Sequence, residues 1–206
     1  YSACGLTYYI QGNFEDYTTL LVRSPEEFEA QNIHVHLRQK CIKILPDAHQ
    51  VLIQNLEDGR AFLVDYDKLV ISTGARPVIP SIKNINLKNV FTVRKIEDGI
   101  NIREKALKSR HATIIGSGYI GIELLESFVE LGLKATLVEF ADHILPVFDE
   151  DMSELIKEQL LTICDNRFEI LTSELVTEFI SNEYGEVSGV KTGSGKQFST
   201  DMVVMC

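Results

Sequence analysis

The sequence predicts an α/β protein in which a parallel β-sheet, with helices on both faces, is joined to a β-rich segment. Two observations support this prediction. Between residues 112 and 161, short apolar runs alternate with stretches of helical period, which is typical of consecutive βαβ units. Between residues 33 and 64, by contrast, short strand candidates follow one another directly. This change of rhythm predicts two domains, 1–86 and 87–206, which meet near residues 84–89.

The composition is that of a globular protein with room for a full core. Of the 206 residues, 45% are apolar and 24% are charged, and no apolar run is long enough to cross a bilayer. The formal net charge of −10 repels the phosphates of nucleic acids and of anionic lipids. We therefore expect neither a nucleic-acid partner nor a membrane partner.

The first half begins with a short helix and continues as strands. Residues 24–33 are expected to be helical, because Ser24 is a good N-cap and Pro25 suits the first helical position. Asp58 and Gly59 supply a turn between two of the strands that follow, which predicts a hairpin. The strands are expected at residues 33–37, 41–45, 51–54 and 61–64.

An apolar strand and a glycine turn close the first half. Residues 69–71 read Leu-Val-Ile and are expected to form a strand. This strand runs into the turn Ser72-Thr73-Gly74-Ala75-Arg76-Pro77, in which the glycine allows another group to approach the backbone closely.

The second half predicts a doubly wound arrangement of the Rossmann-like type. Strands are expected at residues 112–115 and 135–138, and helices are expected at residues 120–131 and 149–161. Beyond Phe168 the pattern returns to short strands, with turns at Tyr184-Gly185 and at Gly193-Ser194-Gly195.

A glycine-rich loop, Gly116-Ser117-Gly118-Tyr119-Ile120-Gly121, connects the strand at 112–115 to the next helix. Gly116 allows a tight turn, Gly118 lets a pyrophosphate approach the backbone, and Gly121 lets the helix pack closely on the sheet. The N-terminus of that helix offers N–H donors to phosphate groups. The loop therefore predicts a dinucleotide-binding site, although such a turn can also serve compact packing alone.

Glu139 ends the next strand, about 20 residues beyond the loop, where a carboxylate can accept hydrogen bonds from a ribose 2′-hydroxyl. The same carboxylate would repel the 2′-phosphate of NADPH. We therefore expect NAD as the ligand, with NADH preferred to NADPH. Two more carboxylates follow the loop: Glu126 is expected to lie on the helix surface, and Glu123 stays open between that position and ligand contact.

The four cysteines are widely spaced along the chain, at Cys4, Cys41, Cys164 and Cys206. Without the close pairs that hold zinc or form a vicinal disulfide, no metal site is expected. Sparse cysteines and the lack of a secretory signal pattern favour a reducing, cytoplasmic location. The chain starts and stops within patterned segments, so we expect both ends to be cut from a longer protein.

The segment around Cys4 carries a family resemblance. Residues 2–10 read SACGLTYYI, and this run resembles the active-site segment of the single-cysteine pyridine nucleotide-disulfide oxidoreductases. That family includes NADH oxidase, NADH peroxidase and coenzyme A disulfide reductase. The resemblance covers nearly the whole chain in family order, from the cysteine segment through the SPEEF helix, the β-rich stretch and the STGARP turn to the glycine loop.

The resemblance implies FAD and NAD as cofactors. It makes 1–86 a partial FAD-binding domain with the redox cysteine segment and an inserted β-rich segment, and 87–206 the NAD(H)-binding domain. It also assigns roles to individual residues. Cys4 would be the redox centre beside the flavin, and Tyr119 would shield the flavin. Two other interpretations stay open, namely Arg94 as a solvated helix residue and Phe148 as a core aromatic. The implied FAD contacts are Ser72, Thr73, Gly74, Ala75 and Arg94, and the implied NAD contacts are Ile120, Glu139 and Phe148.

The resemblance also implies a function. Electrons would pass from NADH through flavin and Cys4 to a small-molecule acceptor, which could be a disulfide, a peroxide or oxygen. The family's N-terminal FAD loop and C-terminal dimerisation domain are missing from the sequence. Because the family dimerises through that domain, we expect the full-length protein to be a homodimer. Because the FAD loop is missing, we expect this chain to bind NAD but little or no FAD, and to be inactive alone. A non-catalytic dinucleotide-binding module and a simple NAD-dependent dehydrogenase are the alternatives.

Overall fold

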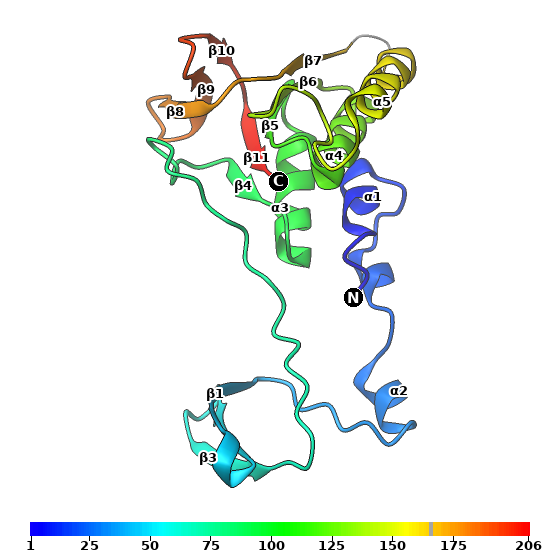
Figure 1. Cartoon of the computed structure of the whole chain (residues 1–206), viewed down its shortest axis with the longest axis vertical. Coiled ribbons are helices and arrows are strands. Elements are labelled where there is room, and N and C mark those ends of the chain that lie inside the picture. Colours follow the sequence, from blue (N-terminus) through cyan, green and yellow to red (C-terminus); the bar gives the residue numbers. More distant parts are fainter. Residues whose placement is uncertain (165–166) are drawn as a thin grey trace. The chain divides into compact units, whose positions relative to one another are not determined.

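The computed structural model describes residues 1–164 and 167–206, and the chain divides into two compact units (Figure 1). Unit 1 consists of Tyr1–Val22 together with Arg76–Cys206, and unit 2 consists of Arg23–Ala75. The cysteine segment therefore belongs to the same compact unit as the glycine loop. Within the described ranges, the helices are all too short or too polar to cross a membrane.

Unit 2 begins with the short helix α2 (Pro25–Glu29), which confirms the expected start at Ser24 and ends earlier than expected. Its first turn is a capping box. The Ser24 hydroxyl accepts a hydrogen bond from the Glu27 amide, and the Glu27 carboxylate accepts one from the Ser24 amide at 2.7 Å. These two reciprocal bonds occupy donors that a helix N-terminus otherwise leaves free.

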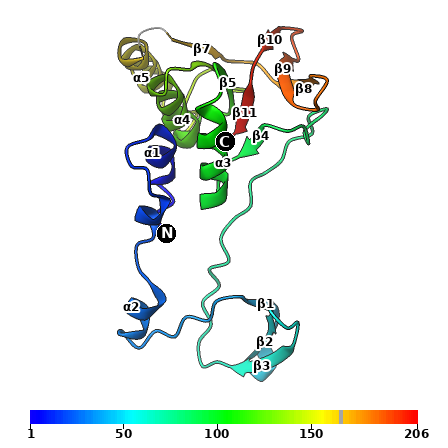
Figure 2. The same ribbon diagram turned by 180° about the vertical axis from the view of Figure 1, so that it is seen from behind.

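The rest of unit 2 is a small antiparallel sheet of order β1-β2-β3, seen most clearly in Figure 2. A left-handed residue, His49, turns the chain into β2 after the short 3₁₀-helix η2, and Gly59 closes the predicted hairpin between β2 and β3. The bounds are β1 (Gln39–Leu45), η2 (Pro46–Ala48), β2 (Gln50–Asn55) and β3 (Ala61–Asp65).

Two predicted strands are wrong. Residues 33–37 and 69–71 take up no strand pairing in the described chain, and Val70 is 84% exposed. Both segments have apolar and β-branched residues in the right pattern, but a strand exists only when a neighbouring strand accepts its backbone hydrogen bonds. Neither segment finds such a neighbour within unit 2.

Unit 1 is built on a five-stranded parallel sheet of order β4-β11-β5-β6-β7. Strand β5 is the middle strand, and β11, the last strand of the chain, inserts between β4 and β5. The strands are β4 (Val90–Thr92), β5 (His111–Ile115), β6 (Lys134–Val138), β7 (Phe168–Leu171) and β11 (Met202–Met205). The predicted strands at 112–115 and 135–138 are confirmed within one residue.

Two of the helices of unit 1 also match the prediction. Helix α4 (Tyr119–Glu130) connects β5 to β6, and α5 (Glu150–Ile163) precedes β7. The prediction lacks α1 (Leu6–Gln11), the 3₁₀-helix η1 (Tyr17–Leu20) and α3 (Ile96–Ala106). Figure 1 shows α1 beside α4, and α4 lies next to β5 and β6.

The two faces of the parallel sheet are covered differently. On one face, Ile114, Leu137 and Val204 join the side chains of the helices in one core, whose largest fully buried member is Phe128. Alternate strand residues such as Val203 point to the opposite face, as the strand period requires. Burying each of these side chains stabilises the fold by roughly 1.5–3 kcal/mol.

The expectation of helices on both faces needs a correction, although the Rossmann-like α/β class is confirmed. The second face packs against side chains such as Phe179 and Val190, which come from an antiparallel three-stranded sheet of order β10-β9-β8. A sheet can cover a sheet as well as a helix can, provided that one of its faces is apolar. The strands are β8 (Val176–Ser181), β9 (Val187–Thr192) and β10 (Gln197–Ser199).

Helix α1 is held firmly within unit 1 by α3. The Arg103 guanidinium donates hydrogen bonds to the carbonyls of Tyr9 and Phe14, at 2.5 and 2.9 Å, and lies 5.0 Å from the Tyr9 ring centroid. A Cβ at Gly99 would lie 2.3 Å from a methyl carbon of Leu6, so α3 approaches α1 closely only because residue 99 is glycine. The limits of the compact units differ from those of the predicted domains 1–86 and 87–206, because α1 belongs to the same unit as α3. The assignment of these domains to FAD binding and NAD binding stays a prediction.

Candidate nucleotide-binding and redox site

The glycine loop joins the end of β5 to the start of α4, and two of its glycines are sterically required. Gly116 has a left-handed backbone with φ of +98°, and a Cβ there would lie 2.9 Å from the Cys206 carbonyl oxygen. A Cβ at Gly121 would lie 2.0 Å from the Gly116 carbonyl oxygen. A larger residue at Gly116 would collide with the backbone that follows β11, and a larger residue at Gly121 would push helix α4 away from the end of β5.

Gly118 has a different reason to be glycine. It is the N-cap of α4, and a Cβ placed on it would meet no heavy atom of the described residues within 4 Å. The space in front of Gly118 is therefore open, and a glycine N-cap brings no side chain that could occupy the first N–H groups of the helix. Free N–H groups and the positive end of the helix dipole suit a pyrophosphate at this position.

Glu139 follows β6 directly and is only 9% exposed. Its Oε2 accepts hydrogen bonds from the Ser117 amide at 2.7 Å and from the Ser117 hydroxyl at 2.6 Å. Its Oε1 accepts one from the Ala141 amide at 2.8 Å. The carboxylate is thus held at the edge of the glycine loop, on the side where β5 and β6 end.

These donors also set the ionisation of Glu139. Burial by itself would raise the pKa of this carboxyl group, but the hydrogen bonds from the Ser117 hydroxyl and from the backbone of Ala141 and Ser117 outweigh it and lower the pKa below its ordinary value. Glu139 therefore carries a negative charge at neutral pH. Ser117 was missed by the sequence analysis, because the residue between the first two glycines of such a loop can be of almost any type.

The chain after Glu139 returns to the glycine loop. The Leu145 amide donates to the Ser117 carbonyl at 3.0 Å, and the ring of Phe148 meets the ring of Tyr119 edge-on, with centroids 5.9 Å apart. Phe148 is 38% exposed, so the interpretation as a core aromatic is wrong. Its predicted contact with the nucleotide stays a prediction, and so does the shielding role of Tyr119.

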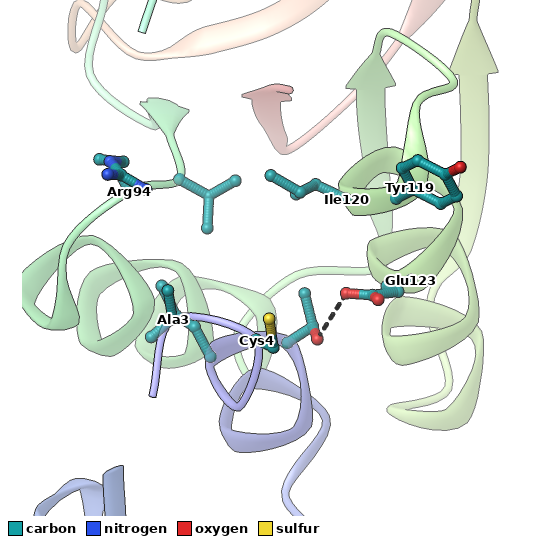
Figure 3. Close-up of a pocket in the computed structure, with 9 residues that line it drawn as sticks. Ala3, Cys4, Arg94, Tyr119, Ile120 and Glu123 are labelled. Atoms are coloured by element: carbon teal, nitrogen blue, oxygen red, sulfur yellow. Dashed lines mark hydrogen bonds between the residues drawn. The ribbon is translucent and has the colours of Figure 1, made fainter. Parts of the chain in front are cut away.

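A pocket of about 280 Å³ lies beside Cys4, entirely within unit 1. Figure 3 shows the Cys4 side chain rising from the segment before α1 toward Ile120, in the first turn of α4. Cys4 is an exposed free thiol. The residues that line the pocket are Ala3, Cys4, Leu6, Thr7, Val93, Arg94, Tyr119, Ile120 and Glu123. The structure thus brings together the candidates Cys4, Arg94, Tyr119, Ile120 and Glu123.

Two charged side chains of this pocket were left open by the sequence. Arg94 lies before α3 begins at Ile96, so it is not a helix residue, and it reaches the pocket wall. Glu123 projects from α4 into the same pocket, where its Oε2 accepts a hydrogen bond from the Thr7 hydroxyl at 2.9 Å (Figure 3). Contact of Glu123 with a ligand stays a prediction.

The remaining candidates belong to unit 2. Ser72, Thr73, Gly74 and Ala75 form an exposed segment after β3, and Gly74 has the left-handed backbone expected of a turn glycine, with φ of +75°. Their predicted contacts with FAD stay a prediction.

The other cysteines have other surroundings than Cys4. Cys41 lies in β1, and Cys164 is buried at the C-terminal end of α5, where burial and then the nearby Glu126 carboxylate raise the pKa of its thiol. A thiol with a raised pKa is a poor nucleophile at neutral pH. Among residues 1–164 and 167–206, His, Cys, Asp and Glu side chains nowhere gather in a group of three that could hold a metal ion.

The fold and the site together define a class: a Rossmann-type dinucleotide-binding protein with a free cysteine beside its nucleotide-binding helix. The family follows from comparison with known proteins. The model of the pyridine nucleotide-disulphide oxidoreductase family matches residues 1–206, and the chain belongs to that family.

Individual relatives agree with this assignment. The chain is 34% identical over 205 residues to an NADH oxidase of Enterococcus faecalis, covering 99% of the chain and 45% of that protein. It is 29% identical to the NAD(P)H coenzyme A polysulfide/persulfide reductase of Pyrococcus horikoshii, covering 100% of the chain and 44% of that protein. The structure of the water-forming NADH oxidase of Lactobacillus brevis bound to NADH matches with a TM-score of 0.87 and 28% identity, over 99% of this chain and 44% of that one. The chain thus spans less than half the length of these relatives.

Proposed function

We propose that the protein is a flavin-dependent NAD(P)H oxidoreductase, which passes electrons from NADH through FAD and Cys4 to a small-molecule acceptor. The observation that carries this proposal is the pocket that Cys4 shares with Tyr119 and Ile120, the first two residues of α4. A redox-capable thiol at the start of a nucleotide-binding helix is what such an electron path requires. Neither a simple dehydrogenase nor a passive nucleotide-binding module needs a thiol at this position.

The residues fit both cofactors. The open space before Gly118 and the buried carboxylate of Glu139 suit the pyrophosphate and the adenosine ribose of NADH. The pocket beside Cys4, with its mostly apolar lining, suits part of a planar aromatic ring system such as that of a flavin. When bound, the two cofactors supply hydride and electron transfer.

The chain's own groups bind, orient and accept electrons. Glu139 would accept hydrogen bonds from the ribose diol, and its negative charge would disfavour the 2′-phosphate of NADPH. Cys4 would be the last electron carrier within the protein. If it is oxidised to a sulfenic acid, two electrons and one proton return it to the thiolate and release one water molecule. If it forms a mixed disulfide with a small thiol, two electrons break the S–S bond and release the Cys4 thiolate and the thiolate of the small thiol.

The acceptor is one of three small molecules: a disulfide, a peroxide or oxygen. The names of the relatives support oxygen and a sulfur compound as acceptors, since one relative is a water-forming NADH oxidase and another is a coenzyme A polysulfide/persulfide reductase. Cys4 stands without a second cysteine within the next few residues, which favours a sulfenic acid or a mixed disulfide over an intramolecular dithiol pair. A homodimeric full-length protein in the cytoplasm completes the proposal.

The test is acceptor-dependent oxidation of NADH by the full-length, FAD-loaded protein. NADH consumption is measured with coenzyme A disulfide, hydrogen peroxide and oxygen in turn, and the product is identified in each case. We expect one acceptor to support rapid turnover that depends on Cys4. Slow consumption with all three, or turnover that is indifferent to flavin removal, would contradict the proposed oxidoreductase.

A further inference from the structure

Ser117 lies between the first two glycines of the loop, and its side chain faces the sheet edge instead of the open space of the nucleotide site. We propose that Ser117 is a positioning residue that sets the NADH preference through Glu139, without itself contacting the nucleotide. This inference rests on the proposed function of Glu139 at the adenosine ribose. It gives a role in nucleotide specificity to a loop position at which the glycine motif allows almost any residue type.

The geometry of Ser117 permits one role for its hydroxyl. Ser117 is fully buried, and its Oγ donates to Glu139 Oε2 at 2.6 Å while it accepts from the Leu145 amide at 3.3 Å. The same carboxylate oxygen also accepts from the Ser117 amide, so one residue supplies two of the three donors to Glu139. Oε2 already accepts two hydrogen bonds and Oε1 accepts only one, so Oε1 is the oxygen that can accept from a ribose hydroxyl.

Removing this hydroxyl affects both the charge and the orientation of the carboxylate. A buried carboxylate is kept ionised by the hydrogen bonds to its charged form, so losing the shortest bond raises the pKa of Glu139. The carboxylate is also less strongly held in one rotamer. A protonated or misdirected carboxyl group accepts less well from the ribose diol of NADH and repels the phosphate of NADPH less strongly.

Other titratable groups lie near Glu139, and their ionisation must be told apart from its own. Glu174, whose amide bonds to the Glu139 carbonyl, has a pKa lowered to about 2 and stays charged. Cys206 and Glu139 line one cavity, and burial raises the pKa of the Cys206 thiol to about 12. On the following loop, Asp142 pairs with His143, which raises the pKa of the imidazole. The Glu139 carboxyl must therefore be observed directly.

The experiment compares Ser117→Ala with Ser153→Ala. Ser153 is an equally buried serine on α5 whose hydroxyl finds no hydrogen-bond partner among the described residues, so it is a matched control. Carbon-13 NMR of the glutamate carboxyls gives the pKa of Glu139 without nucleotide, and calorimetry gives the affinities for NADH and NADPH. We expect Ser117→Ala to raise the pKa of Glu139 and to weaken NADH binding by about two- to tenfold. The difference between the affinities for NADH and NADPH should become smaller. Ser153→Ala should leave all three unchanged.

A second variant separates positioning from loop damage. Ser117→Thr keeps a hydroxyl donor and is expected to restore the low pKa of Glu139 and most of the NADH preference. An unchanged pKa in Ser117→Ala, or an equal loss of both nucleotides, would overturn the inference, because the loop backbone would then carry the effect. If Glu139→Ala leaves NADH binding intact, the proposed role of Glu139 fails instead, and the two failures are distinguishable.

Discussion

The Thr7 hydroxyl donates a 2.9 Å hydrogen bond to Oε2 of Glu123, across 116 positions of the sequence. Thr7 is buried and lies on α1, within the cysteine segment, whereas Glu123 lies on the nucleotide-binding helix α4. One side-chain bond thus connects the segment that carries the redox candidate to the helix that carries the nucleotide loop.

The first prediction is that this bond contributes measurably to the stability of unit 1. Thr7→Val removes the hydroxyl with little change in shape and should lower the free energy of unfolding by about 0.5–1.5 kcal/mol. In a double-mutant cycle with Glu123→Ala, the coupling should be of the same size. The matched cycle with Glu126→Ala, one turn further along α4, should give coupling below about 0.5 kcal/mol. Equal coupling in both cycles would rule out a specific Thr7–Glu123 bond.

The second prediction concerns Cys4 in the full-length enzyme. Cys4→Ser should abolish turnover with the natural acceptor and leave flavin reduction by NADH intact, because the serine hydroxyl cannot carry the electrons onward. Stopped-flow absorbance separates these two steps. Cys41→Ser changes another exposed cysteine and is the control, expected to retain turnover. The assignment is wrong if Cys41→Ser stops turnover and Cys4→Ser does not.

The third prediction separates two glycines of one loop. Gly121→Ala places a Cβ 2.0 Å from the Gly116 carbonyl oxygen and should cost stability by about 1–3 kcal/mol or more. Gly118→Ala places its Cβ in open space on a backbone with φ of −66°, so its melting temperature should equal that of the wild type. NADH affinity should nevertheless fall by about tenfold, since the methyl group lies where the pyrophosphate approaches. Thermal melts and calorimetry of both variants check this, and normal NADH binding by Gly118→Ala would contradict it.

The fourth prediction is that Glu139 determines nucleotide choice. A hydrogen bond to a charged group contributes about 1.5–3 kcal/mol, so Glu139→Ala should weaken NADH by about ten- to a hundredfold. The same change removes the repulsion of a 2′-phosphate and should narrow or invert the preference for NADH. Calorimetric titration of both nucleotides measures this. Equal affinities of the wild type for the two nucleotides would count against the role of Glu139.

The fifth prediction uses the pH dependence of Glu174. Its Oε1 accepts from the Ser194 hydroxyl at 2.6 Å and pairs with the Lys196 ammonium at 3.1 Å; these contacts, the hydroxyl first, lower the pKa of Glu174 from 4.5 to about 2. A depressed pKa means that the charged form stabilises the fold above pH 4.5, and that this contribution is lost as pH falls through about 2.

Glu174→Gln should therefore destabilise the protein at pH 7, and the difference from the wild type should shrink as the pH falls below 4.5. Urea unfolding at a series of pH values measures this difference. Glu183→Gln alters an exposed carboxylate in the turn between β8 and β9 and is the control, expected to match the wild type throughout. A difference that stays constant down to pH 3 would show that Glu174 acts by packing and not by charge.

Local patterns in the sequence were enough to predict the elements around the nucleotide loop. Helix α4 and its flanking strands start and end within one residue of their predicted limits, because apolar period, glycine turns and capping depend on neighbours a few positions away. The same locality explains why Gly116, Gly118 and Gly121 could be assigned separate roles before any contact was known. Their roles follow from where a strand must turn into a helix.

The strands expected at 33–37 and 69–71 mark the limit of such patterns. Their residues suit strands, yet strand formation depends on a partner whose presence no local window reveals. The short helix α1 was missed for the opposite reason. Its six residues have little helical signal of their own, and packing against α3 and α4 supplies the stability that an isolated turn of helix lacks.

The sequence by itself determined the fold class, the nucleotide loop and Glu139 as the acidic residue beyond it. Only the tertiary structure decided that an antiparallel sheet covers the second face, that Cys4 and Ile120 share one pocket, and that Ser117 holds the Glu139 carboxylate. The physical reason is range. Propensity and period act between near neighbours in the chain, whereas pockets and buried hydrogen bonds join residues far apart in sequence, and these form only when the whole unit has packed.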